Sequence, residues 1–168
     1  TIKGGTANDS ITLAQKATVD AGAGDDTIVT SATGGTLTGG AGKDMFNIAN
    51  TTVSTQTTEA TGVVKVTITD LTAGDTIKFA NQGNEVFNKI KLDVSGASNL
   101  DAALTTAFAG DGGTNGIINW FQYAGNTYIV EDVTTGGIAS GDIVVKINGL
   151  VDLSNSTYVD VTDTLTIA

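Results

Sequence analysis

Residues 4–12 (GGTANDSIT), 21–29 (AGAGDDTIV) and 39–47 (GGAGKDMFN) are three copies of one nine-residue pattern. The shared pattern is G-G-x-G-x-D-x-U-x, where U is a large apolar residue, and each of the first two copies departs from it at one position. Glycine allows backbone conformations with positive φ, so the first half of each copy can form a tight corner with its carbonyl oxygens close together. The last three residues form a very short strand with one side chain pointing inward.

The sixth position of every copy is an aspartate, which supplies a hard anionic oxygen: Asp9, Asp26 and Asp44. Calcium in proteins takes about 6–8 oxygen ligands, including carboxylates and backbone carbonyls. The three aspartates are 17 and 18 residues apart, which is close to two nonapeptides. If two nonapeptides make one full turn, the aspartates stack on one edge and bind calcium (Ca2+) there. The apolar residues stacked inside are then Ile11, Ile28 and Phe46.

The half-turns between the three copies lack the pattern. Residues 13–19 contain no glycine, and residues 33–38 (TGGTLT) contain no acid. We therefore expect calcium on one edge, none or only weak binding on the other, and two ions between the three acidic corners. The alternative is a series of Gly- and Asp-rich turns in an ordinary β protein. Three copies at a nearly constant period favour calcium binding.

The composition excludes several classes of function. The chain has 168 residues, enough for one domain with its own core, and a formal net charge of -10 without any Arg. A nucleic acid or an anionic membrane would need a basic patch, so neither is expected as a partner. The absence of Cys and His excludes disulfides, thiol catalysis, His-ligated zinc and Ser-His-Asp triads. No apolar run approaches the roughly 20 residues of a membrane span, so no membrane insertion is expected.

The expected fold class is all-β, with a parallel β-roll of the repeats that continues into a β-sandwich-like C-terminal part with one short helix. Residues 1–50 are the repeat region and residues 51–168 the β-rich C-terminal part, joined as one continuous domain. Residues 50–62 are polar and Thr-rich, which is typical of a surface loop. The chain begins at Thr1, almost inside the first copy, without Met or a signal peptide, so we expect it to be the C-terminal piece of a longer protein.

Residues 63–79 predict a strand, a Gly-containing turn and a second strand, with acids on both sides of the turn. Asp70 and Asp75 can be turn residues of a hairpin, because Asp favours turns. They can equally be ligands of another calcium loop, and the spacing alone leaves both alternatives open.

Further strands are predicted over residues 86–94, 117–123, 127–133 and 142–147, and a last short strand or extended tail over 163–168. The Gly-Asn turn at 124–126 predicts a hairpin between the second and third of these strands. Residues 98–108 predict a helix that is capped by Ser98 or Asn99, ends at Gly110 and covers the sheet. The aromatic residues favour core packing over sugar binding: Trp120, Phe121, Tyr123 and Tyr128.

The repeats match those of the RTX family of proteins, which leave the cell by type I secretion. Residues 39–47, 68–71 (ITDL) and 74–79 (GDTIKF) resemble the C-terminal β-roll region of serralysin-type secreted proteases, although Leu71 stands where that family usually has Phe. Residues 120–132 (WFQYAGNTYIVED) and 141–149 (GDIVVKING) are similar to the C-terminal regions of bacterial surface-layer proteins and RTX adhesins.

The resemblance implies a C-terminal module of a secreted, cell-surface protein. Such a chain passes unfolded through an ATP-driven type I secretion transporter by means of an uncleaved C-terminal signal, and it folds on extracellular calcium. The ending around Asp163, with Leu165, Ile167 and Ala168, resembles those acid-plus-apolar signals. We expect a structural module of a surface-layer-like protein, and the ions can also join subunits into a surface lattice.

The alternative function is the secretion and folding domain of an RTX enzyme, such as a metalloprotease or a lipase, whose chemistry lies upstream. A catalyst built from paired carboxylates is not expected, because the place of Asp25 and Asp26 in the repeat already explains them. The resemblance to the proteases makes Asp70 and Asp75 candidate ligands, and Asp132 and Asp142 are further acids that flank a loop at 134–141. The expected ligands are the carboxylates of Asp9, Asp26 and Asp44 and the carbonyls of Gly4, Thr6, Ala21, Gly22, Ala23, Gly24, Gly40 and Gly42.

Overall fold

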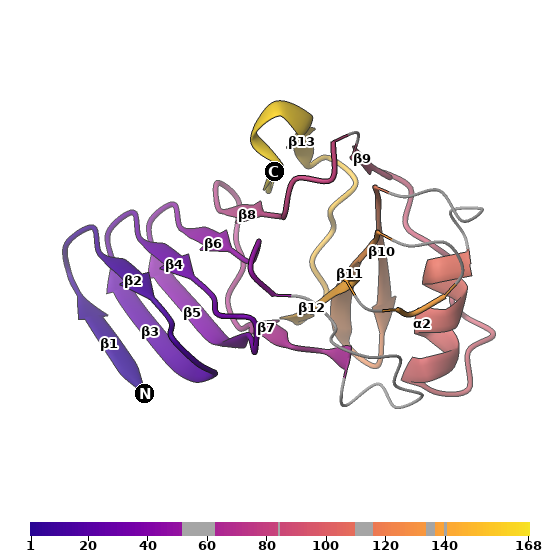
Figure 1. Cartoon of the computed structure of the whole chain (residues 1–168), viewed down its shortest axis with the longest axis horizontal. Coiled ribbons are helices and arrows are strands. Elements are labelled where there is room, and N and C mark those ends of the chain that lie inside the picture. Colours follow the sequence, from indigo (N-terminus) through magenta and orange to yellow (C-terminus); the bar gives the residue numbers. More distant parts are fainter. Residues whose placement is uncertain (52–62, 84, 110–115, 134–136, 140) are drawn as a thin grey trace.

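The computed structural model describes residues 1–51, 63–83, 85–109, 116–133, 137–139 and 141–168, which form two β-sheets with a helix at one end (Figure 1). One sheet has eight strands in the order β1-β3-β5-β7-β12-β11-β10-β9. The other sheet has six strands in the order β13-β14-β8-β6-β4-β2. The protein is therefore mostly β with parallel ladders, which agrees with the predicted all-β class.

From β1 to β8 the chain alternates between the two sheets, and each strand pairs in parallel with the strand two places along the chain. We call each odd-numbered strand with the even-numbered strand that follows it a coil, and the segment joining the two a corner. Four coils stack side by side in Figure 1. Their strands are β1 (Ile2–Gly5), β2 (Ser10–Thr12), β3 (Ala17–Ala23), β4 (Thr27–Val29), β5 (Gly35–Ala41), β6 (Met45–Asn47), β7 (Val66–Ile68) and β8 (Thr76–Lys78).

One apolar residue from each even-numbered strand enters the core. Ile11 is opposite Ile28, Ile28 is opposite Phe46, and Phe46 is opposite Ile77 in the strand register. The last three of these side chains are fully buried. The prediction that Ile11, Ile28 and Phe46 stack inside is confirmed. The odd-numbered strands contribute a matching row: Val19, Leu37 and Ile68.

Residues 70–79 do not form a hairpin. Strand β7 belongs to the eight-stranded sheet and β8 to the six-stranded sheet, and each pairs in parallel with its counterpart in the third coil. The hairpin alternative for this segment is therefore wrong, because the two strands face one another across the core instead of pairing. The segment between them is a fourth corner.

The same two sheets continue into the C-terminal half, so hydrogen-bonded ladders cross the predicted boundary at residue 50. Strand β12 pairs in parallel with β7, and β12, β11 and β10 form an antiparallel meander that ends beside β9. In the other sheet β14 pairs with β8 and with β13, both antiparallel. The bounds are β9 (Val86–Phe87), β10 (Ile117–Tyr123), β11 (Asn126–Asp132), β12 (Ile143–Asn148), β13 (Thr157–Val159), a 3-10 turn η1 (Asp160–Thr162) and β14 (Thr164–Thr166).

Helix α2 (Leu100–Ala109) lies where the sequence predicts it. Its first turn is capped by Asn99, whose Oδ1 accepts a hydrogen bond from the Ala102 amide at 2.8 Å. The buried face packs against β10 and β11 and forms a second apolar cluster with residues such as Phe121 and Tyr128. The predicted helix end at Gly110 lies outside the described residues, as do most of the predicted loop 50–62 and part of the loop 134–141. Within the described parts, no helix has both the length and the apolar character of a membrane crossing.

Three predictions of elements need correction. The strand predicted over 86–94 is only β9, and Ile90 beyond it is 76% exposed because this stretch leaves the sheet. The hairpin between β10 and β11 turns on Ala124 and Gly125, not on Gly-Asn, and Asn126 is already paired in β11. Strand β13 and η1 were not predicted, because the run of apolar residues before Asp163 (Tyr158, Val159 and Val161) is too short to distinguish a strand from a loop.

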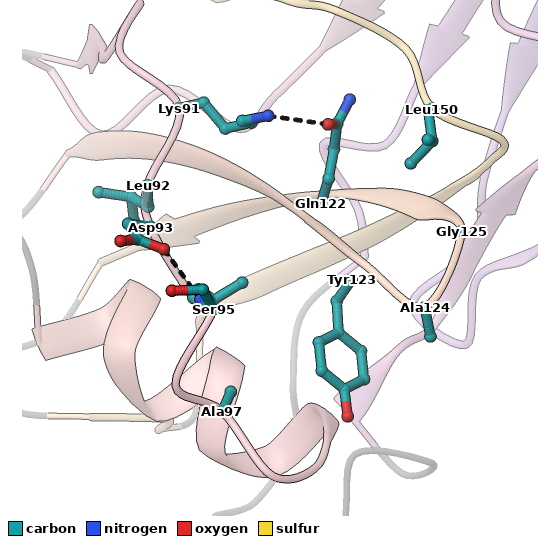
Figure 2. Close-up of a pocket in the computed structure, with 11 residues that line it drawn as sticks. Lys91, Leu92, Asp93, Ser95, Ala97, Gln122, Tyr123, Ala124, Gly125 and Leu150 are labelled. Atoms are coloured by element: carbon teal, nitrogen blue, oxygen red, sulfur yellow. Dashed lines mark hydrogen bonds between the residues drawn. The ribbon is translucent and has the colours of Figure 1, made fainter.

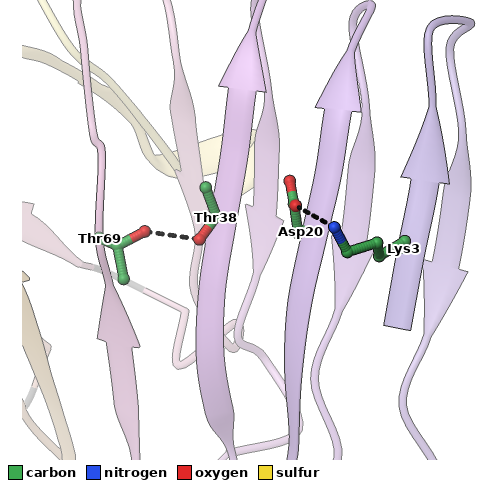
Figure 3. A network of polar contacts seen from close by, with 4 residues as sticks. All are labelled: Lys3, Asp20, Thr38 and Thr69. Atoms are coloured by element: carbon green, nitrogen blue, oxygen red, sulfur yellow. Dashed lines mark hydrogen bonds and ion pairs between the residues drawn. The ribbon is translucent and has the colours of Figure 1, made fainter. Parts of the chain in front are cut away.

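The outer face of the coils is polar (Figure 3). The Lys3 ammonium lies 3.6 Å from the Asp20 carboxylate on the neighbouring strand, and the hydroxyls of Thr38 and Thr69 are 2.7 Å apart. These pairs join adjacent coils at the surface, where an ion pair contributes at most about 1 kcal/mol. The coils therefore depend on their interior and on their corners for stability.

The stacked apolar row predicts a large loss of stability for Ile28→Ala. Ile28 is fully buried, whereas Ile90 is 76% exposed, so Ile90→Ala is a matched control with the same change of side chain. We expect Ile28→Ala to lower the free energy of unfolding by about 2–5 kcal/mol and Ile90→Ala by less than about 0.5 kcal/mol, measured by denaturant unfolding in calcium. Equal losses for the two variants would contradict the packing described here.

The hairpin turn predicts a stabilising substitution. Ala124 and Gly125 have φ of 47° and 77°, which are the signs that a type I′ turn requires at both central positions. Alanine tolerates this region poorly, while Asn followed by Gly is the preferred pair. Ala124→Asn should raise the free energy of unfolding by roughly 0.5–1 kcal/mol. A fall in stability on denaturant unfolding would show that the turn has another geometry.

Candidate metal centre

The corners bring four aspartates into one row. The strand register places Asp9, Asp26, Asp44 and Asp75 opposite one another, since each is the residue just before its even-numbered strand. For the last three, the amide that follows the aspartate donates to the carbonyl of the aspartate before it in the row. These bonds run from Thr27 to Asp9, from Met45 to Asp26 and from Thr76 to Asp44, each at 2.8 Å. The predicted stacking of the first three aspartates on one edge is confirmed. The fourth, Asp75, was a candidate ligand, but its place in the row did not follow from the spacing because it follows Asp44 by 31 residues instead of 18.

Three of the four aspartates accept a hydrogen bond from the aspartate before them in the row. The Oδ1 atom of Asp26 accepts from the amide of Asp9 at 2.7 Å, and that of Asp44 accepts from the amide of Asp26 at 2.9 Å. The Oδ1 atom of Asp75 accepts from the amide of Asp44 at 2.9 Å. One carboxylate oxygen of each of these three aspartates therefore holds successive coils together.

The second oxygen has no hydrogen-bond partner in three of the four. The Oδ2 atoms of Asp9, Asp26 and Asp44 are buried and accept no hydrogen bond. In Asp75 the corresponding oxygen accepts from the amide of Thr72 at 2.8 Å. A buried carboxylate oxygen without a partner is unfavourable, and it commonly indicates an ion or a water molecule that completes the site. Three such atoms in one row indicate a cation.

Backbone carbonyl oxygens converge on the same row. A Cβ atom built at Gly4 would overlap both the carbonyl oxygen of Ala21 and the Oδ2 of Asp9. A Cβ at Gly39 would likewise overlap the Oδ2 of Asp44. At Gly4, a backbone carbonyl oxygen and a carboxylate oxygen therefore both lie beside the same glycine. A cation coordinated by both oxygens would remove their repulsion.

The glycines of the corners let successive coils approach closely. Gly40 and Gly42 have φ of 104° and 136°, where an L side chain is strained. A Cβ on Gly40 would overlap the carbonyl oxygen of Gly22, and a Cβ on Gly42 would overlap that of Gly24. The carbonyls of Gly22 and Gly24 therefore lie at the interface between the second and third coils.

The aspartates of the edge also repel one another. Burial raises the pKa of Asp44, and the charges of Asp75, Asp26 and Asp70 raise it further, although the hydrogen bond from the Asp26 amide lowers it. The row therefore concentrates negative charge where the carboxylates are partly shielded from solvent. The donors are carboxylate and carbonyl oxygens only, which is the ligand chemistry of a hard cation such as calcium.

The remaining predicted ligands differ in their positions. Thr6 and Ala23 lie in the first and second corners, and Ala23 is opposite Ala41 in the strand register. Asp70 lies at the start of the fourth corner, where its two oxygens accept from the amides of Gly39 and Gly40 at 3.0 and 2.8 Å.

The two later candidates lie in another part of the sheet. Asp132 is the last residue of β11, and Asp142 lies just before β12 and accepts from the amides of Val133 and Ala139. Neither belongs to a corner. Asp142 closes the connection between the two strands, which explains its burial without a metal.

The opposite edge of the coils is chemically different. Its described residues, 13–16, 30–34, 48–51 and 63–65, include no Asp or Glu. The hydroxyl oxygens of Thr30 and Thr51 lie 2.7 Å apart, and the Thr30 hydroxyl also donates to the Asn47 carbonyl. Hydroxyls thus satisfy one another on this edge, whereas carboxylate oxygens remain without partners on the other.

A second acidic cluster, which was not predicted, lies beside the C-terminal segment of the chain. Carboxylate oxygens of Glu85, Asp160 and Asp163 lie within 4.8 Å of one another. Glu131 on β11 is fully buried beside them, and neither of its oxygens has a hydrogen-bond partner. Burial raises the pKa of Glu131 to about 8, with further contributions from the charges of Glu85, Asp163 and Asp142. These residues come from separate segments, so no local spacing could reveal the cluster.

A pocket of about 550 Å³ lies between the β10–β11 turn and the segment before α2 (Figure 2). Lys91 donates to Gln122 across it at 3.0 Å, and Tyr123 lines its wall. Asp93 is the one acid among its lining residues, so it offers no pair of carboxylates for acid-base chemistry. The other aromatic residues of this region, Trp120, Phe121 and Tyr128, are buried, which confirms core packing for them.

No model of a known protein family matches the chain, and no match is found among curated proteins. The function therefore has to be inferred from the chemistry of the two oxygen-rich places. One is the row of stacked aspartates at the corners, and the other is the cluster around Glu85 and Asp163.

The environment of Glu131 predicts a pH-dependent stability. Its pKa is about 8 in the folded chain and ordinarily 4.5, so the folded state holds more protons between these values and loses stability as pH rises through them. In the presence of a chelator, Glu131→Gln should melt higher than the wild type at pH 8 by at least about 2–4 °C, which corresponds to roughly 1 kcal/mol. The two melting temperatures should converge near pH 4.5. Parallel pH profiles for the two proteins would contradict the prediction.

Proposed function

We propose that the chain is a calcium-binding module whose four coils form a parallel β-roll with ions held between successive corners. The observation that carries the proposal is the row of buried Oδ2 atoms of Asp9, Asp26 and Asp44, which have no hydrogen-bond partner. The carbonyl oxygen of Ala21 approaches the same space as the first of them. A divalent cation would satisfy these oxygens and offset their mutual repulsion.

Calcium fits this donor set better than other common metals. The corners offer oxygen only, and zinc or copper sites usually contain nitrogen or sulfur ligands. Magnesium requires near-octahedral geometry and keeps several waters, while calcium accepts 6–8 oxygens in flexible arrangements. Carboxylates and carbonyls from two neighbouring corners supply such an arrangement.

The ligands follow from the stacking. We assign the carboxylates of Asp9, Asp26 and Asp44 and the corner carbonyls predicted above to the ions, with Asp75 as the fourth carboxylate of the row. Four corners enclose three gaps, so the fourth corner provides one gap more than the two expected from the sequence. Asp70 is a further candidate, and like Asp75 it accepts a backbone hydrogen bond at each of its oxygens.

Binding at these gaps would decide whether the coils fold. Each short strand buries one large side chain, so the coils have little core of their own. A site with a Kd about 100-fold below the ambient calcium concentration adds about 2.7 kcal/mol to stability. Two or three sites would add roughly 5–8 kcal/mol, against a total of about 5–15 kcal/mol for a typical domain. The chain would then be partly unfolded without calcium.

Such a dependence suits a protein that crosses a membrane unfolded and folds outside the cell. We therefore propose a C-terminal module of a bacterial surface protein, similar to surface-layer proteins, that is exported by a type I secretion transporter. The resemblance of the repeats to RTX proteins and the net charge of -10 support this role. The alternative is the same kind of module on a secreted RTX enzyme, and a zinc-binding H-E-x-x-H motif upstream of these residues would favour that alternative.

Calcium titration of two matched variants tests the proposed role of the corners. Asp44→Asn removes the charge of one corner carboxylate, and Asp20→Asn removes the same charge from the outer face of β3. Calorimetry should show weaker calcium binding for Asp44→Asn and wild-type binding for Asp20→Asn. The calcium-induced rise in melting temperature should shrink by roughly 5–10 °C for Asp44→Asn alone, as loss of one site worth about 2.7 kcal/mol predicts.

Circular dichroism provides the accompanying control. The wild type should lose β signal in a chelator and regain it when calcium, but not sodium, is added. If the spectrum and the melting temperature are the same with and without calcium, or if both variants bind calcium as the wild type does, the proposed function is wrong.

A further inference from the structure

A second concentration of carboxylates lies beside β9 and β13, away from the first coil. Glu85 lies just before β9, and Asp160 and Asp163 lie in and directly after η1. Their carboxylate oxygens are within 4.8 Å of one another. Strands β9 and β13, which flank these residues, lie close together beside the C-terminus in Figure 1. The cluster therefore joins the middle of the chain to its last segment.

The carboxylates are held in place by the backbone. The amides of Gln82 and Gly83 donate to the two oxygens of Glu85, and the amide of Glu85 donates to the Oδ1 of Asp160 at 2.9 Å. The carbonyl of Asp163 accepts from the amide of Phe79 at 2.9 Å, which attaches η1 to the end of β8. The three acids cannot simply separate to relieve their repulsion without breaking these hydrogen bonds.

Buried oxygens without partners point into this cluster. Asp163 is 6% exposed, and its Oδ1 is buried and accepts no hydrogen bond. Glu131 is fully buried, and both of its oxygens lack partners. The hydroxyl of Tyr158 is also buried without a partner, and the charges of Glu85, Glu131, Asp163 and Asp160 contribute to a raised pKa of this tyrosine. Asp163, Glu131 and Tyr158 thus each contribute an oxygen without a hydrogen-bond partner near the cluster.

Within the described part of the chain, no Lys makes an ion pair with these acids. The one ion pair among the described residues joins Lys3 to Asp20, which are on β1 and β3. Lys89 lines a neighbouring pocket of about 210 Å³, but it is exposed and makes no ion pair. The same pocket is lined by Glu85 and Asp160, so solvent and ions can reach two of the three acids.

We propose that Glu85, Asp160 and Asp163 bind a divalent cation of the calcium type at a site that is independent of the repeats. Oxygen ligands alone favour calcium over zinc, and a mixture of carboxylates and a phenol oxygen within reach is compatible with its flexible coordination. An ion at this place fastens η1 and β14 to the segment between β8 and β9. The ion therefore acts as a clamp that holds the C-terminal segment in place. The ions of the repeats cannot do this, because they lie between the corners.

The test compares two isosteric variants of the full chain. Asp163 has φ of 54°, a left-handed conformation that Asn also tolerates, so Asp163→Asn removes the charge with little change of backbone. Asp152→Asn is the matched control, because that carboxylate is exposed and bonded only to a nearby turn amide, that of Ser154. Calcium calorimetry should give one ion fewer per chain for Asp163→Asn and the wild-type number for Asp152→Asn.

Terbium luminescence locates the ion. Terbium takes calcium sites, and a neighbouring tyrosine sensitises its emission, so Tyr158 should sensitise an ion at this cluster. Tyr158→Phe and Asp163→Asn should each remove that emission, while Asp152→Asn should leave it. If Asp163→Asn does not give a folded spectrum in circular dichroism, Glu85→Gln replaces it with the same expected results.

The outcome is separable from that of the repeat edge. Asp44→Asn should leave the tyrosine-sensitised emission intact, and Asp163→Asn should leave the ions of the corners in place. A wild-type calcium number and wild-type emission in both Asp163→Asn and Glu85→Gln would overturn the proposed clamp, as expected if Lys89 neutralised the acids instead. That result would not affect the proposed role of the corners, and loss of binding in Asp44→Asn alone would leave only the corners as calcium sites.

Discussion

The structure depends on the hydrogen bonds that the aspartates of the second, third and fourth corners accept from the aspartate of the coil before. The even-numbered strands are three residues long, so each ladder has few backbone hydrogen bonds to fix its register. A slip of one residue would turn Ile28 or Phe46 away from the core. The carboxylates of Asp26, Asp44 and Asp75 prevent such a slip, because each can reach only one amide of the preceding coil. The corners thus fix the register of both sheets.

This constraint explains what could and could not be predicted from the sequence. The first three corners could be predicted because their shape depends on residues close in the sequence: glycines, one aspartate and one apolar residue within nine positions. The stacking of Ile11, Ile28 and Phe46 followed from the spacing of these corners. The fourth corner keeps only Gly74 and Asp75. The extra residues before it fall between β6 and β7 in the sequence, so they change the spacing of the aspartates but not the register of the strands. Spacing alone therefore left a hairpin open, which the sheet topology excludes.

The C-terminal features were harder to predict because they depend on contacts between distant segments. The helix and the hairpin were found, since a cap, an apolar face and a tight turn are local signals. The cluster of Glu85, Asp160 and Asp163 gave no signal, because the amide that binds Asp160 is 75 residues away in the chain. A buried acid such as Glu131 also looks ordinary in the sequence: it stands beside Asp132 at the end of an apolar strand, and only its surroundings distinguish it.

The row of corner aspartates and the cluster around Glu85 and Asp163 both lie against one continuous apolar core. A single apolar cluster includes Leu13 in the first half of the chain and Ile167 near its end, so the coils and the C-terminal strands share their interior. Unneutralised carboxylates at either end destabilise that shared core, the corners through repulsion within the row and the C-terminal cluster through burial of Glu131 and Asp163. Because packing couples the two places, a cation at one of them would also stabilise the strands that position the acids of the other. A chain with a net charge of -10 and two such places would fold cooperatively with its cations instead of binding them to a finished structure.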